Sequence, residues 1–171
     1  MRAALDKLFT LAGWLSGVFM VGTLLAVLLG IVARAVAFDI PGTDAYAGYS
    51  MAAGAFLALA YTLRRGEHIR VTLIVGRLEG AARRALELFC HAVAVLLSGA
   101  LGWYSVRLVW QSYEMHDVSQ GLDATPLWIP QIAMAVGAVL FFVAFVSDFV
   151  AVLRGEAVAE EREGGEPAHV E

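Results

Sequence analysis

Four stretches without a charged side chain limit what this chain can fold into more than any other feature of its sequence. They cover residues 8–33, 45–63, 88–106 and 124–147. At 1.5 Å per residue, even the 19-residue stretches form helices that nearly span the ~30 Å hydrocarbon core of a bilayer. Unpaired backbone groups are costly in lipid, so each stretch is expected to be helical. We therefore predict an all-α, integral membrane four-helix bundle.

The composition supports a membrane protein and leaves little room for catalysis. Hydrophobic residues make up 60% of the 171 residues and charged residues 16%, compared with about 45–50% and 25% in soluble domains. The four stretches use about half of the chain, so only short loops remain. We expect no enzymatic activity and no nucleic-acid partner, and assign any function to the helices, their loops or a partner protein.

The Lys and Arg residues are distributed asymmetrically. Ten of the twelve precede the first stretch, follow the fourth, or lie between the second and the third, whereas Arg34 and Arg107 lie on the other side. Cytoplasmic loops are enriched in Lys and Arg. This bias predicts cytoplasmic N and C termini, with residues 34–44 and 107–123 outside. Residues 1–153 are the predicted membrane domain, and the Glu-rich residues 154–171 are a predicted disordered, acidic cytoplasmic tail.

The first stretch has a second interpretation, as a cleaved signal peptide. Residues 35–37 read Ala-Val-Ala, which fits the small-residue pattern of a cleavage site. The apolar stretch is 26 residues long, whereas a signal peptide has an apolar region of about 7–15 residues. We therefore expect residues 1–37 to be retained.

The segment between the second and third stretches is predicted to lie along the membrane interface. Apolar side chains recur there at helical spacing, and arginines repeat every seven residues on another face. The apolar set is Val71, Val75, Leu78, Ala82 and Leu86, and the basic set is Arg70, Arg77 and Arg84. Gly76 and Gly80 disfavour a helix, so a looser basic loop is the alternative.

The predicted spans contain almost no group that could carry chemistry. His91 is their only imidazole, and its place near the cytoplasmic end of the third stretch fits an interfacial histidine. A haem site would need a second histidine, and an independent ion-coupled pump would need a buried carboxylate. We expect Asp44 and Asp148 to flank spans rather than enter them. The sequence therefore predicts no cofactor and no metal site.

Small residues mark faces on which helices can approach closely. Gly13 and Gly17 are four residues apart in the first stretch, and Gly48 and Ala52 are four apart in the second. Such spacing is typical of packed membrane helices. The faces serve either packing among these four helices or contact with another subunit, and the sequence leaves both alternatives open.

Two motifs carry a family resemblance. After the second stretch the chain has an R-x-G-x-H-I-x-V pattern, and a proline-flanked segment opens the last stretch. The first motif is Arg64, Arg65, Gly66, Glu67, His68, Ile69, Arg70 and Val71, and the second contains Pro126, Trp128 and Pro130. Together with Arg34 at the end of the first stretch, the span order and the length, they resemble the small membrane subunit (DctQ type) of tripartite ATP-independent periplasmic (TRAP) transporters. The resemblance covers about residues 8–153.

The first motif is expected to form the cytoplasmic boundary of the second span or a subunit contact. We expect Arg64 and Arg65 to place their guanidinium groups among lipid phosphates. Gly66 would then allow a turn into the interfacial segment. His68 is either an interfacial polar group within this chain or a contact to the large subunit.

The resemblance implies a bacterial inner-membrane complex. In that family a periplasmic substrate-binding protein (DctP type) captures an organic anion such as a carboxylate, and a large membrane subunit (DctM type) moves it with sodium. The small subunit would be a scaffold for the large one. Family members often carry a tryptophan and paired glutamates at the start of the second span, where this chain has Asp44, Ala45 and Tyr46.

Two other functions stay as alternatives. A self-sufficient small transporter or channel would need a charged or broken helix at mid-membrane. A membrane enzyme or cytochrome subunit would need metal or haem ligands. The sequence offers neither feature, which favours the transporter subunit.

Overall fold

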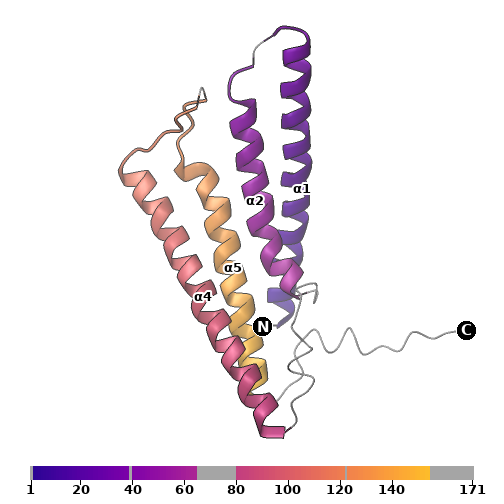
Figure 1. Cartoon of the computed structure of the whole chain (residues 1–171), viewed down its shortest axis with the longest axis vertical. Helices are drawn as coiled ribbons and strands as arrows, with labels where there is room; N and C mark the ends of the chain where they lie inside the picture. Colours follow the sequence, from indigo (N-terminus) through magenta and orange to yellow (C-terminus); the bar gives the residue numbers. More distant parts are fainter. Residues whose placement is uncertain (1, 39, 65–79, 122, 155–171) are drawn as a thin grey trace, which may run out of the picture.

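The structure, a computed structural model, describes residues 2–38, 40–64, 80–121 and 123–154, and these residues form four helices (Figure 1). These are α1 (Arg2–Ala35), α2 (Thr43–Arg64), α4 (Gly80–Glu114) and α5 (Trp128–Leu153). The extended backbone in these ranges is limited to one isolated bridge between Val118 and Pro126. The predicted all-α fold class is therefore confirmed.

Three of the described helices are long and apolar enough to cross a membrane. The segments are Leu5–Ala35, Arg83–Glu114 and Trp128–Leu153. α2 is less apolar, but its 22 residues extend over ~33 Å. α2 also packs between α1 and α5, so much of its surface faces protein. The chain is thus a multi-pass membrane protein, and the crossing by α2 follows from its length and position.

The helices extend past the charge-free stretches at several ends. α4 begins at Gly80 and ends at Glu114, whereas its charge-free stretch covers residues 88–106. In its first turns, Arg83 pairs with Glu87 at 2.8 Å, a spacing that favours helix. Residues 80–86 of the predicted interfacial segment thus belong to α4, and residues 65–79 lie outside the described residues. Charged side chains end the lipid-facing part of a helix without ending the helix.

α1 and α4 end in the same way. The residues that follow them, Ala37 and His116, have φ of 55° and 54°. Phe38 donates its N–H to the carbonyl of Ala33 at 2.9 Å, and Asp117 donates to Ser112 at 3.0 Å. This is the Schellman pattern, which usually uses glycine at the left-handed position. Each end satisfies its last carbonyls and turns the chain back.

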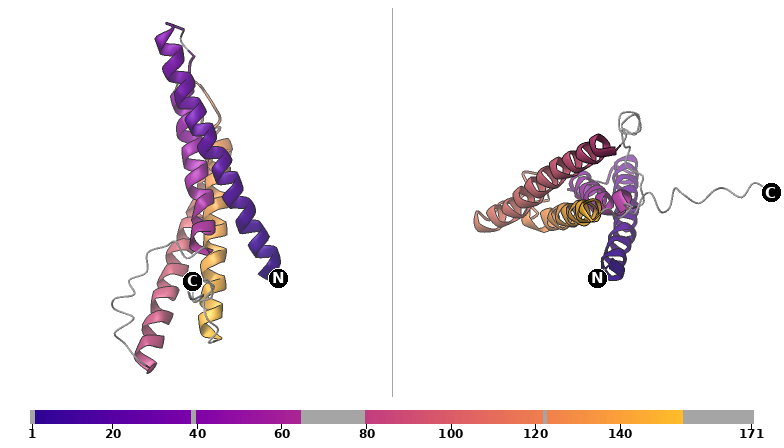
Figure 2. Two further views of the ribbon diagram at one scale, coloured as in Figure 1. Left: turned by 90° about the vertical axis from the view of Figure 1, so that its right-hand side faces the viewer. Right: turned by 90° about the horizontal axis from the view of Figure 1, so that it is seen from below.

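The helices form a row in the order α1, α2, α5, α4 rather than a closed ring (Figure 1). The main pairings are α1 with α2, α2 with α5, and α4 with α5. Figure 2 shows α1 and α4 at opposite sides of the row, with their N-terminal ends splayed apart. The two central helices have neighbours on both sides, whereas α1 and α4 expose many large apolar side chains.

Small residues allow the close approach between neighbouring helices. Ser16 of α1 donates its hydroxyl to the carbonyl of Gly54 in α2 at 2.8 Å. Gly137 of α5 faces the backbone of Phe56 in α2, so that an added Cβ would lie 2.9 Å from the Leu57 nitrogen. On α4, three serines seven residues apart are buried: Ser98, Ser105 and Ser112. In lipid the hydrophobic effect does not drive helices together, so close packing and hydrogen bonds of this kind hold them side by side.

The contact at Gly137 leads to a stability prediction. We expect Gly137→Ala to destabilise the fold by about 1–3 kcal/mol, because the new methyl group overlaps the α2 backbone. Gly48→Ala in α2 is the matched control, since its added Cβ meets no atom within 4 Å. Thermal unfolding of the purified variants in detergent measures both. Equal melting temperatures for the two variants would contradict the close α2–α5 contact.

Candidate functional site

An ion-pair cluster joins α1, α2 and α5 at the end of α2. One guanidinium nitrogen of Arg64, Nη2, lies 2.9 Å from the Asp6 carboxylate of α1. The other, Nη1, lies 3.6 Å from the Asp148 carboxylate of α5. The guanidinium carbon also lies 5.1 Å from the ring centre of Phe9. We refer to Asp6, Phe9, Arg64 and Asp148 as the Arg64 cluster.

The Arg64 cluster reaches into the apolar core of the protein. Only 6% of the Asp148 side chain and 17% of the Arg64 side chain are exposed. Asp148 lies five residues before Leu153, the last residue of α5. That places it about 11 Å from the helix midpoint, within the ~15 Å of hydrocarbon on that side of a bilayer.

Two expectations from the sequence are corrected here. Asp148 lies inside the predicted membrane-crossing helix α5 rather than beside it. Arg64 pairs with two carboxylates of its own chain rather than pointing to lipid phosphates. The reason for both is the same: a carboxylate and a guanidinium that face each other each supply the countercharge that lipid cannot.

The chemistry of the Arg64 cluster is that of a structural contact rather than of a cation site. A guanidinium within 4 Å of both carboxylates occupies the position that a coupling cation would need. Among the described residues, no group of three or more His, Cys, Asp and Glu side chains is arranged to hold a metal ion. The cluster therefore fixes the relative positions of three helices.

A second polar network connects the α4–α5 loop to α2 at the opposite end of the row. Tyr49 donates its hydroxyl to the Asp123 carboxylate at 3.1 Å, and Ser119 donates to the other oxygen at 2.8 Å. The hydroxyl oxygens of Thr125 and Tyr46 lie within hydrogen-bond distance, at 3.2 Å. We call Tyr46, Tyr49, Ser119, Asp123 and Thr125 the loop network.

The loop network stabilises the ionised form of Asp123. Partial burial raises the pKa of this carboxyl, but hydrogen bonds from Thr125, Ser119, its own backbone and Tyr49 lower it, and the net pKa lies below the ordinary value of 3.8. A carboxylate favours such donors in its charged state. Asp123 is therefore ionised at neutral pH and holds the loop against α2.

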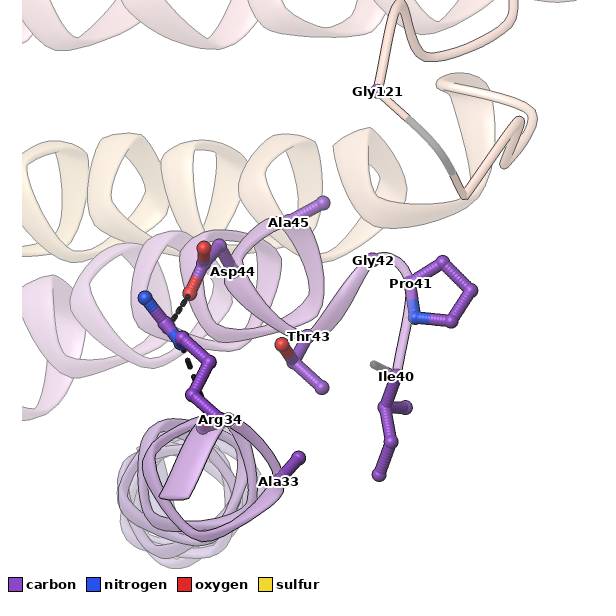
Figure 3. A pocket seen from close by; sticks show the side chains of 10 residues that line it. Ala33, Arg34, Ile40, Pro41, Gly42, Thr43, Asp44, Ala45 and Gly121 are labelled. Atoms are coloured by element: carbon purple, nitrogen blue, oxygen red, sulfur yellow. Dashed lines mark hydrogen bonds and ion pairs between the residues drawn. The ribbon is translucent and has the colours of Figure 1, made fainter. Parts of the chain in front are cut away.

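A shallow pocket of about 300 Å³ lies between the α1–α2 connection and the α4–α5 loop. Figure 3 shows Arg34 of α1 reaching toward Asp44 of α2. The two form an ion pair at 3.0 Å with 66% and 83% of their side chains exposed, and Arg34 also donates to the carbonyl of Gly30 at 3.1 Å. Both charges of the pocket are thus paired with each other. An exposed pair of this kind contributes little to stability.

The structure places only part of the sequence motifs. Arg65, Gly66, Glu67, His68, Ile69 and Arg70 lie outside the described residues, as do residues 155–171 of the acidic tail. Pro126 forms the isolated bridge with Val118, and Trp128, the first residue of α5, packs edge-on against Tyr113 at 5.7 Å. Pro130 lies in the first turn of α5, where the missing N–H has no helical acceptor.

The four small residues singled out in the sequence have different environments. An added Cβ on Gly13 would lie 2.7 Å from the Tyr61 ring, so this glycine packs within the chain. Gly17 and Gly48 have nothing within 4 Å of an added Cβ, and Ala52 is exposed. Packing among the four helices therefore explains Gly13 alone of the four.

Sequence reasoning missed most members of both clusters. Asp6, Phe9 and Asp148 were not assigned to any site, although an acid at each of two helix ends on the same side as Arg64 was a usable signal. Tyr49 and Asp123 gave no signal, because these two residues are 74 positions apart in the sequence and meet only in the folded row.

One comparison with known proteins identifies a family. The family model described as "Tripartite ATP-independent periplasmic transporters, DctQ component" matches residues 23–155. This region contains α2, α4, α5 and the C-terminal part of α1, from Thr23 onward. None of the curated proteins compared with the chain matches it.

The Arg64 cluster generates a double-mutant prediction. We expect Arg64→Gln to destabilise the fold by about 3 kcal/mol, because it removes the guanidinium that faces the buried Asp148. Combining it with Asp148→Asn should recover part of this loss, since the buried charge is removed as well. Chemical unfolding in detergent measures the free energy of unfolding of the wild type, the two single variants and the double variant. Arg34→Gln is the control and should lower the free energy of unfolding by less than about 1 kcal/mol. If the effects of Arg64→Gln and Asp148→Asn simply added up, Arg64 and Asp148 would not be paired.

The loop network generates a pH prediction. A pKa lower in the folded state than its ordinary value of 3.8 adds stability above that value, and this stability is lost as the pH falls through the folded-state pKa. Asp123→Asn should therefore melt at a lower temperature than the wild type at neutral pH, and the gap should narrow as the pH falls below 3.8 and through the lower folded-state pKa. Asp117→Asn, in the same loop, is the control. A gap that stayed constant with pH would show that the charge of Asp123 is not involved.

Proposed function

Because the chain belongs to the DctQ family and is thus a small membrane subunit of a tripartite ATP-independent periplasmic transporter, we propose that it is the scaffold for a large transport subunit. The large subunit, of the DctM type, would move an organic anion such as a carboxylate together with sodium. A periplasmic binding protein of the DctP type would deliver the anion. The membrane is proposed to be the bacterial inner membrane.

The observation that carries the scaffold proposal is the location of the buried charges. Arg64 lies between Asp6 and Asp148 within 4 Å of both, so the charges buried at this end serve packing of the chain itself. Ion-coupled transport needs a site that can bind and release its ion. The described residues offer no such site, which supports placing ion and substrate binding on the large subunit.

The exposed faces of the row support a second membrane subunit as partner. On α1, four large apolar side chains spaced seven residues apart are 57–65% exposed: Leu11, Val18, Leu25 and Val32. Gly17 and Gly48 lie open to the surroundings. Lipid covers apolar side chains as well as a protein does, but open small residues favour a close helix contact. We propose that Gly17, Gly48 and Ala52 belong to the contact with the large subunit.

The proposed orientation places both termini in the cytoplasm. It rests on the distribution of Lys and Arg, with Arg34 and Arg107 alone on the other side. The loop network and the pocket at Arg34 would then face the periplasm, where the binding protein docks. His68 and its neighbours would face the cytoplasm, at the boundary of α2 or at the large subunit.

Reconstitution separates the scaffold from a self-sufficient transporter. We expect proteoliposomes with this chain alone to show no sodium-dependent uptake of organic anions above empty liposomes, because the described helices offer no ion site. Together with its large subunit and the substrate-loaded binding protein, the chain should support uptake, and the two membrane subunits should co-purify. Uptake by this chain alone would contradict the scaffold and favour an independent small transporter.

A further inference from the structure

A cleft that the proposed function does not use lies between α2, α4 and α5. It has a volume of about 450 Å³. α4 contributes Leu101, Arg107, Leu108 and Gln111, and the facing walls include Phe56 of α2 and Met134 of α5. We call it the Arg107 cleft. Along α4, Leu101 lies at one end of the cleft and Gln111 at the other, with Tyr104, Ser105, Arg107 and Leu108 between them.

The Arg107 cleft has the dimensions of one bilayer leaflet. From Leu101 to Gln111 the α4 backbone rises ~15 Å, half of the ~30 Å hydrocarbon core. Measured from the midpoint of the segment Arg83–Glu114, Arg107 lies about 13 Å along the helix. The guanidinium is therefore at the boundary where lipid phosphates begin, and Leu101 is near the middle of the bilayer.

Arg107 places a positive charge at this boundary. Arg107 is exposed and forms no ion pair among the residues that the structure describes. The other cation on the same side, Arg34, is paired with Asp44. An arginine at the edge of hydrocarbon can extend its guanidinium to the level of the lipid phosphates. Trp110, on the same helix, is 63% exposed, as is typical of side chains at the level of the head groups.

We propose that the Arg107 cleft binds one anionic phospholipid from the leaflet on the side of the α4–α5 loop. The phosphodiester would contact Arg107 and Gln111, and one acyl chain would extend along Leu101 and Leu108 toward the bilayer centre. A lipid fits better than a partner helix because the cation lies at the depth of the phosphates and the apolar part ends near the depth at which an acyl chain ends. The lipid would fill the space between α2 and α4 over α5.

Native mass spectrometry of the purified chain in mild detergent, titrated with phosphatidylglycerol, tests the cleft. We expect one tightly retained lipid per chain, and Arg107→Gln should weaken its binding about fivefold, the effect of one interfacial cation on an anionic lipid. Leu108→Trp, which fills the apolar part, should weaken the retention of phosphatidylglycerol and of zwitterionic phosphatidylcholine alike. Arg34→Gln is the control, with equal loss of charge on the same side but outside the cleft.

Two results would overturn the proposal. One is equal weakening by Arg34→Gln and Arg107→Gln, which would mean unspecific attraction to the surface. The other is that Arg107→Gln and Leu108→Trp retain the lipid as well as the wild type does. If these variants also failed to co-purify with the large subunit, the cleft would be a protein contact and not a lipid site. Because the titration uses this chain alone, its outcome is independent of the transport assay.

Discussion

The rest of the structure depends on the pairing of Arg64 with Asp6 and Asp148. Asp148 lies at a depth where lipid would otherwise surround it, and an isolated charge there is costly. The guanidinium therefore fixes how far α2 and α5 can slide past each other. The apolar residues Phe9, Ala60, Leu63 and Ala144 pack around the same point. One set of contacts thus determines the register of three helices at this end of the row.

The other end of the row is held by different chemistry. There the Asp123 carboxylate accepts hydrogen bonds from Tyr49 of α2 and Ser119 of its own loop. Between the two ends, close contacts such as Ser16 with Gly54 and Gly137 with Phe56 bring the helix backbones together. Polar contacts at both ends of the row and small residues between them are consistent with the proposed role as a scaffold.

The sequence predicted the helices well because hydrocarbon leaves few choices. Apolar length and the absence of charge located all four helices, and the motif after α2 indicated the family that the family model then matched. The same rule failed at Asp148, because a count of charges cannot tell a solvated carboxylate from one that faces an arginine on another helix. The ends of α1 and α4 were also beyond prediction, since Ala37 and His116 occupy positions where glycine is usual.

The packing faces were only partly predictable, for a geometric reason. Gly13, Gly17, Gly48 and Ala52 share the spacing of packed membrane helices, yet Gly13 alone of them packs inside the chain. Spacing defines a face of a helix but not what that face meets. The row order α1, α2, α5, α4 leaves one side of α1 and of α4 uncovered, and no local pattern encodes that order. The uncovered sides are where lipid and the large subunit would compete.

A distance measurement between the outer helices tests the scaffold most directly. Spin labels at Val21 of α1 and Leu97 of α4, which are 56% and 62% exposed, can be placed in a Cys90→Ala background in the assembled transporter. Pulsed electron paramagnetic resonance then compares the resting complex with the complex supplied with sodium and loaded binding protein. For a fixed scaffold we expect the same distance in both states. A change of more than about 2 Å during transport would show that the row itself moves, which contradicts a fixed scaffold.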